Sequence, residues 1–79
     1  MNEFKKNDVL AEIGNNKKLF WIVRQVAKDG YFFDAFFDGK FHVIGNWMGF
    51  WVVHRHMVKV DEWDAKNKRM RGLDEDDEL

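Results

Sequence analysis

Eleven of the thirteen aromatic residues in the chain lie between Phe20 and Trp51, in short runs separated by Asp-Gly and Gly-Asn pairs. Aromatic side chains pack well on the pleated surface of a β-sheet, and glycine supplies the positive φ angles that tight strand reversals need. The pattern therefore predicts a small, twisted, aromatic-rich sheet. It constrains the architecture far more than it constrains an activity.

The chain of 79 residues has room for one domain with one core. It contains no cysteine, which excludes disulfide bridges and cysteine-based zinc or iron–sulfur sites. Buried aromatic side chains must stabilise the domain instead, at roughly 1.5–3 kcal/mol each. We expect a single β domain over residues 1–73, with the barrel at about 6–61, and a disordered acidic tail at 74–79.

The order of apolar runs and turn residues predicts a meander of short antiparallel strands. Residues 8–13 are predicted to form the first strand, although Phe4, Val9 and Ile13 also fit one face of an N-terminal helix. A polar turn is expected at 14–18, tight turns at 28–30 and 38–40, and a looser reversal at 45–49. The later strands are expected at residues 19–27, 31–38, 41–44 and 50–55, with a short closing strand at 57–60 after a helical turn.

A short helix is predicted over residues 61–71. Asp61 is a candidate N-cap, Glu62 and Lys66 have the spacing of an interacting pair on a helix, and Gly72 follows the last turn. The acidic residues beyond Gly72 would lie at the unfavourable end of the helix dipole, so the disordered tail is expected to begin there.

Short strands, tight turns and an aromatic interior favour a five-stranded barrel or a half-open antiparallel sheet, because closure hides edges that would pair with other chains. Over residues 6–61, Lys-Asn-Asp-Val-Leu at 6–10, Trp-Ile-Val at 21–23, Asp-Gly-Tyr at 29–31 and Val-Lys-Val-Asp at 58–61 resemble the order seen in SH3-like and KOW-like modules. Asn7 stands where such modules often carry glycine. The resemblance implies an SH3-like barrel.

In size, composition and lack of a catalytic motif, the chain also resembles the small early proteins of large tailed phages, many of which bind and disable one host protein. That resemblance implies a stoichiometric inhibitor in host takeover, whose usual targets are cell division, transcription, replication or proteolysis. The start of the chain lacks the apolar region of a signal peptide, and no stretch has the length of a membrane span, so we expect a cytoplasmic protein.

The chain offers little material for catalysis. It has no serine, threonine or cysteine, so the commonest covalent nucleophiles are missing, and its glycines are too scattered for a phosphate-binding loop. His42, His54 and His56 are a conceivable metal site, but surface histidines are the favoured interpretation. Asp34 and Asp38, about 13 Å apart along a strand, are too distant to act as a retaining pair of carboxylates. We expect neither enzymatic activity nor a cofactor or metal.

The aromatic residues exceed what one small core covers. Phe32 and Phe36 fall on the opposite strand face from Tyr31, Phe33 and Phe37. An exposed aromatic face on a soluble protein marks a partner surface, for a target protein or for self-association. Alternatively, the N-terminal segment or the C-terminal helix covers this face, with Trp63 filling the gap. The predicted partner-binding anchors are Phe32, Phe36, Trp47, Met48 and Trp51.

A second hypothesis is a small nucleic-acid-binding barrel, in which bases stack on these aromatic rings. The formal net charge of −1 argues against bulk electrostatic binding of nucleic acid. Basic residues that would flank such a platform are interrupted by Asp29, Asp34 and Asp38. These basic residues are Lys17, Lys18, Arg24, Lys28 and Lys40.

Overall fold

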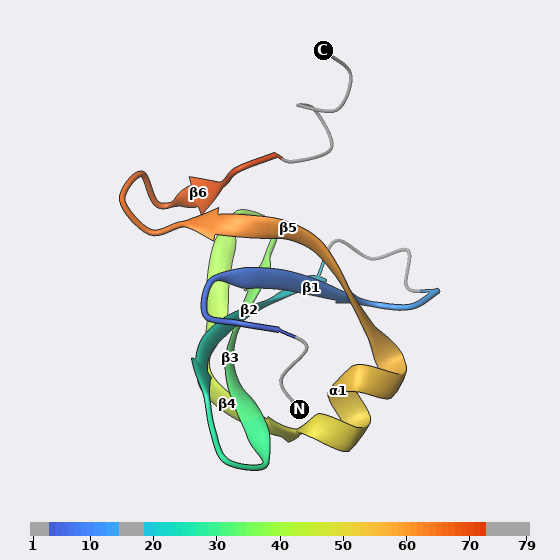
Figure 1. The fold of residues 1–79 in the computed structure, drawn as a ribbon. Helices are drawn as coiled ribbons and strands as arrows, with labels where there is room; N and C mark the ends of the chain where they lie inside the picture. The colour runs from blue at the N-terminus through green and yellow to red at the C-terminus, as the bar shows by residue number, and fades with distance from the viewer. Residues whose placement is uncertain (1–3, 15–18, 73–79) are drawn as a thin grey trace.

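The computed structural model describes residues 4–14 and 19–72. Over these residues the chain is mainly β, with one short helix, and it forms a half-open antiparallel sheet (Figure 1). The predicted fold class is therefore confirmed. The elements are β1 (Asp8–Glu12), β2 (Leu19–Val26), β3 (Gly30–Phe37), β4 (Lys40–Gly49), α1 (Phe50–His56), β5 (Met57–Asp64) and β6 (Arg69–Met70).

The strand order in the sheet is β4-β3-β2-β1-β5-β6. The first four strands form a meander, and α1 then carries the chain back so that β5 pairs with β1 (Figure 1). A register shift lies between Val9, which is paired with Asp61, and Leu10, which is paired with Lys59. Such a bulge increases the local twist, and here it helps the sheet to curl into a half-barrel.

One face of the sheet carries the hydrophobic core. Its side chains alternate along β3, where Tyr31, Phe33 and Ala35 are buried and the residues between them are only partly so. Val53 of α1 packs into the same cluster, which explains why the helix stays attached to the sheet. The buried residues of this cluster are Leu10, Val23, Tyr31, Phe33, Val53 and Met57.

The other face carries a second aromatic cluster. The rings of Phe36, Phe41 and Trp63 all contact one another, with centroid distances of 5.0 Å for Phe36–Phe41, 5.5 Å for Phe36–Trp63 and 5.3 Å for Phe41–Trp63. Trp63 belongs to β5, which is at the other side of the sheet from β3 and β4. These contacts therefore hold the curled sheet together on its second face.

Two predicted elements are wrong. Residues 50–55, expected as a strand, belong to α1, and residues 61–71, expected as a helix, form the end of β5, a turn and β6. The predicted reversal at 45–49 is also wrong, because these residues continue β4 through a bulge at Gly45, whose φ is 74°. The sheet thus has six strands rather than five.

The N-terminal alternative is settled in favour of a strand. Residues 8–12 form β1, and Asn7, just before it, has a φ of 76°. Asparagine tolerates this left-handed conformation better than most residues, which fits its place directly before β1. The predicted acidic tail at 74–79 and most of the polar turn at 14–18 lie outside the described residues. No helix in the described ranges has the length and apolar character needed to cross a membrane.

Candidate functional site

Large apolar side chains are exposed mainly along one side of the sheet. Strand β4 is at one edge of the sheet, and four of its ten residues are apolar and exposed, with Phe37 beside them on β3. Exposed apolar side chains gathered on one strand make it a candidate contact surface. The four residues of β4 are Phe41, Val43, Ile44 and Trp47.

Phe32 and Trp47 form a cross-strand pair between β3 and β4. Trp47 is 48% exposed, and its indole lies against Gly30, where an added Cβ would come within 2.7 Å of the indole Nε1. Glycine at position 30 therefore gives the indole the room that it occupies. The ring is supported on one side and open to solvent on the other, as a contact residue needs to be.

Trp51 lies four residues further along, in the first turn of α1. Its side chain is 69% exposed, and the guanidinium carbon of Arg55 lies 5.3 Å from its ring centroid. Residues four apart on a helix are neighbours, so this cation–π contact orients the indole without burying it. Trp47 and Trp51 thus flank the junction between β4 and α1.

Two of the other predicted anchors, Met48 and Phe36, have their contacts elsewhere. Met48 is partly buried and packs against the core, opposite Tyr31. Phe36 belongs to the second aromatic cluster, where Trp63 contacts it, as the alternative hypothesis anticipated in part. Of the five predicted anchors, Phe32 and Trp47 form a cross-strand pair, Trp51 follows four residues after Trp47, and only the two tryptophans are exposed.

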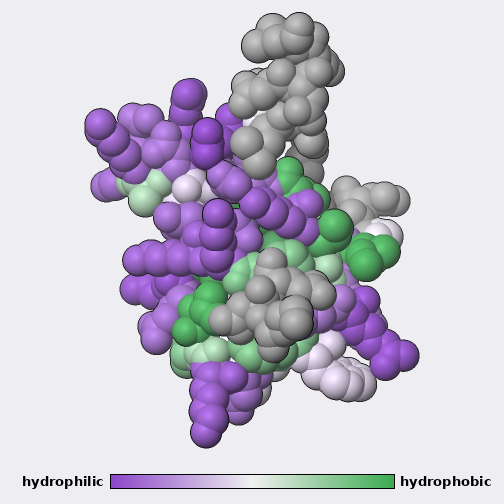
Figure 2. Space-filling model, viewed as in Figure 1, coloured by the Kyte–Doolittle hydropathy of each residue, from purple (hydrophilic) through white to green (hydrophobic). Residues whose placement is uncertain are grey.

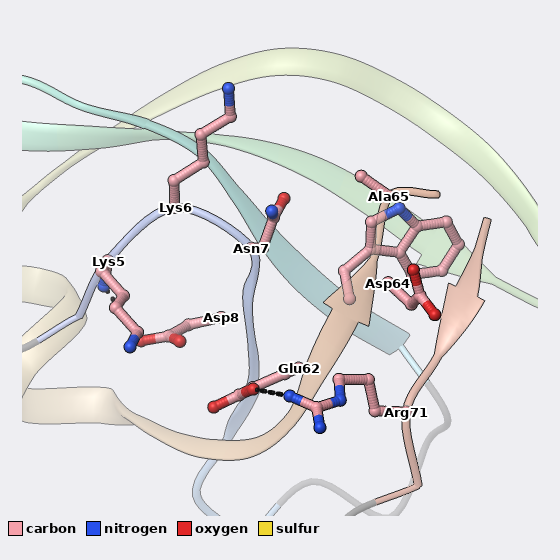
Figure 3. Close-up of a pocket in the computed structure, with 9 residues that line it drawn as sticks. Lys5, Lys6, Asn7, Asp8, Glu62, Asp64, Ala65 and Arg71 are labelled. Atoms are coloured by element: carbon pink, nitrogen blue, oxygen red, sulfur yellow. Dashed lines mark hydrogen bonds and ion pairs between the residues drawn. The ribbon is translucent and has the colours of Figure 1, made fainter. Parts of the chain in front are cut away.

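A polar hollow of about 530 Å³ lies between the segment before β1 and the β5–β6 hairpin (Figure 3). Asp8 and Lys5 line one wall, and Glu62 and Arg71 form an ion pair of 2.8 Å on the other. Figure 2 shows that the region of the β5–β6 hairpin is strongly hydrophilic. The charged side chains around the hollow pair with one another. We therefore interpret them as stabilising the fold rather than as binding a ligand.

Lys59 is the centre of these charges. Its Nζ lies 2.7 Å from Glu62 Oε2 and 3.3 Å from Asp8 Oδ1. The hydrogen bond to Glu62 raises the pKa of Lys59 against the opposing effect of burial, and Asp8 adds to the rise. The same bond lowers the pKa of Glu62, with help from Arg71.

A neighbouring hollow of about 400 Å³ bears on the nucleic-acid hypothesis, because Trp63 and Phe41 line it together with Lys6 and Arg24. Arg24, however, forms an ion pair with Asp34 at 3.3 Å. Aromatic rings and cations are therefore present together, but a carboxylate already compensates the guanidinium charge of Arg24.

His54 and His42 form hydrogen bonds with different partners. The Nε2 of His54 is 2.6 Å from the Tyr31 hydroxyl, whereas the Nε2 of His42 is 2.9 Å from the Phe37 carbonyl oxygen. Among residues 4–14 and 19–72, no cluster of three or more His, Cys, Asp or Glu side chains is arranged to hold a metal ion.

Comparison of the chain with known protein families, curated proteins and solved structures finds no match. The edge position of β4 is the main functional feature that the sequence reasoning missed. Residues 41–48 place apolar side chains on both strand faces, a pattern typical of a strand inside a sheet, so the sequence alone does not indicate an edge strand.

Proposed function

We propose that the protein is a non-enzymatic interaction module that binds one partner protein through the exposed tryptophans at the junction of β4 and α1. The observation that supports this proposal is the exposure of Trp47 and Trp51. The indole of Trp47 packs against Gly30, and the guanidinium group of Arg55 lies over the ring of Trp51. Tryptophan and arginine are the residues most enriched in the energetic centres of interfaces. Phe32 extends the apolar surface beside Trp47.

The resemblance to small early phage proteins supports a narrower form of the proposal. In that form the partner is a host cytoplasmic protein, and the module inhibits it by occupying one of its surfaces. A nucleic-acid role has weaker support, because Arg24 beside the aromatic hollow is paired with Asp34.

Affinity capture from a nuclease-treated bacterial lysate, washed at two salt concentrations, tests the proposal. We expect one discrete protein to be retained by the wild-type chain at both salt concentrations and to be lost with Trp51→Ala. Val58→Ala is the matched control, because Val58 is also exposed but lies on β5. Unchanged circular dichroism of both variants shows that the fold is intact.

Two outcomes contradict the proposal. Equal retention by Trp51→Ala and the wild type would show that this tryptophan is not part of the contact. Recovery of nucleic acid that is lost at the higher salt concentration would favour a phosphate-dependent interaction, since counterion release makes such binding steeply salt-dependent.

A further inference from the structure

The two edges of the sheet are very different. Within the described part of the chain, strand β6 has two residues and pairs only with Trp63 and Asp64, and the rest of β5, whose outer side it leaves unpaired, carries a single exposed large apolar side chain, Val58. Strand β4 has ten residues, and β3 is its only neighbour among the described strands. Its outer row of N–H and C=O groups is therefore a template for another strand.

The side chains of β4 resemble those of a strand that has another strand on each side. Phe41 and Trp47 lie opposite Phe36 and Phe32, on the second face of the sheet, whereas Val43 lies opposite the buried Ala35. Exposed apolar side chains thus occur on both faces of the same strand. Apolar residues on both faces are characteristic of strands inside a sheet rather than at its edge.

Charged side chains at the two ends of β4 indicate what kind of strand could pair with its free edge. The turn before the strand carries Asp38 and ends at Lys40, and the turn that carries Lys28 and Asp29 meets its other end, where Phe50 N–H donates to the Asp29 carbonyl oxygen at 3.0 Å. All four charged side chains are exposed, and none forms an ion pair with another described residue.

An antiparallel second copy would place each of these charges near an opposite one. Lys40 would lie toward Asp29 of the second copy, and Lys28 would lie at the same end of the shared sheet as its Asp38. Parallel pairing would instead bring the two Lys40 side chains together, which is unfavourable. The arrangement is isologous, as in the commonest class of homodimer.

We propose that a second copy of this chain pairs antiparallel along β4, so that two half-barrels share one continuous sheet. The bulge at Gly45, whose N–H donates to Asp34 Oδ1 at 3.0 Å, lies near the middle of the strand and sets the register. Residues 40–43 of one copy then meet residues 46–49 of the other on both sides of the two-fold axis. The proposal is independent of the partner protein proposed above.

Sedimentation equilibrium of the full chain, from micromolar to millimolar concentration, tests this pairing. We expect a monomer–dimer equilibrium whose dissociation constant rises about tenfold or more in Val43→Lys, because the two-fold axis brings the introduced charges together at the edge. Val58→Lys is the matched control. Val58 is 47% exposed and Val43 46%, but Val58 lies on β5, opposite Ala11 of β1 and away from β4, so its variant keeps the wild-type constant.

Amide hydrogen exchange provides a second readout that does not depend on a variant. We expect the amides of β4 to gain protection as the wild-type concentration rises, while those of β6 do not. A single-copy mass at every concentration would overturn the proposal, as would open-ended oligomers or an equal effect of Val43→Lys and Val58→Lys. Trp51→Ala should leave the dimer intact, which separates this test from that of partner binding.

Discussion

The Nζ of Lys59 lies 3.3 Å from Oδ1 of Asp8, across the pairing of β5 with β1. Asp8 is only 3% exposed, and its other oxygen accepts the N–H of Lys5 at 2.9 Å. Oδ1 has no hydrogen bond of ordinary geometry with a described residue, so Lys59 supplies its compensating charge. A buried carboxylate requires such compensation.

Lys59→Met should therefore lower the free energy of unfolding by about 2 kcal/mol, since a buried group left without its partner typically costs about 1–3 kcal/mol. Urea unfolding measures the change. The double variant with Asp8→Asn should regain part of the loss, because the unpaired charge is gone. Arg24→Met is the control, at a more exposed ion pair that should contribute less than about 1 kcal/mol. Equal effects of Lys59→Met and Arg24→Met would contradict this account.

The pH dependence of stability should report on Glu62. Its hydrogen bond with Lys59 lowers its pKa below the ordinary value of 4.5, so the native state favours the charged form. The contribution of Glu62 is then fully present above pH 4.5 and is lost as the pH falls through the lower pKa of the folded state.

Urea midpoints measured from neutral to acidic pH check this prediction. Glu62→Gln should be less stable than the wild type near neutrality, and the difference should shrink below pH 4.5. Glu12→Gln, at an exposed carboxylate of β1, controls for the loss of an acidic residue as such. A difference from the wild type that stays constant down to the acid limit would argue against a pairing role for Glu62.

The helix α1 shows where strand propensity fails as a guide. Phe-Trp-Val-Val at residues 50–53 favours a strand by composition. In the fold, the chain must return from β4 to the side of β1, and a helix achieves this while Phe50, Val53 and Met57 reach the core. Their spacing of three and four residues is a helical pattern that the prediction of a strand at 50–55 did not take into account.

The C-terminal segment shows that one set of charges fits two structures. Asp61 and Glu62 were assigned to a helix start, but Asp61 accepts the N–H of Gly72 at 2.9 Å, and Glu62 pairs with Arg71 rather than Lys66. Asp64 Oδ1 accepts the N–H of Asn67 at 3.1 Å within the hairpin turn. The pairing across the hairpin decides the outcome, and i,i+4 spacing carries no information about it.

The candidate site was predictable in its residue types but not in its arrangement. Trp47 and Trp51 were expected at a glycine-rich reversal, and the aromatic excess did indicate exposed rings. The reversal is instead a bulge in a long edge strand, where Asp34 of β3 binds the N–H of Gly45. This contact joins residues eleven apart in sequence, so local turn chemistry could not reveal it.

Gly30→Ala should destabilise the protein by about 1–3 kcal/mol, the usual effect of overpacking. A Cβ at position 30 would lie 2.5 Å from the Met48 carbonyl oxygen and 2.7 Å from Trp47 Nε1. Backbone and indole must both move, so tryptophan fluorescence should change along with the unfolding midpoint. Gly49→Ala is the control, because its Cβ would approach Trp47 no closer than 3.5 Å. Equal stability of the two variants would show that the Trp47 indole is not held against Gly30.

The hydrogen bond between Tyr31 and His54 should contribute about 1 kcal/mol of coupling energy, within the usual range for residues in contact. The two atoms are 2.6 Å apart, Tyr31 is fully buried, and the imidazole stacks on Phe50 at 8° between ring planes. A double-mutant cycle of Tyr31→Phe with His54→Leu, followed by thermal unfolding, measures this coupling. The cycle of Tyr31→Phe with His42→Leu is the control and should be additive, since His42 hydrogen-bonds to Phe37 instead. Additivity in both cycles would show that the hydrogen bond between Tyr31 and His54 does not help to hold α1 to the sheet.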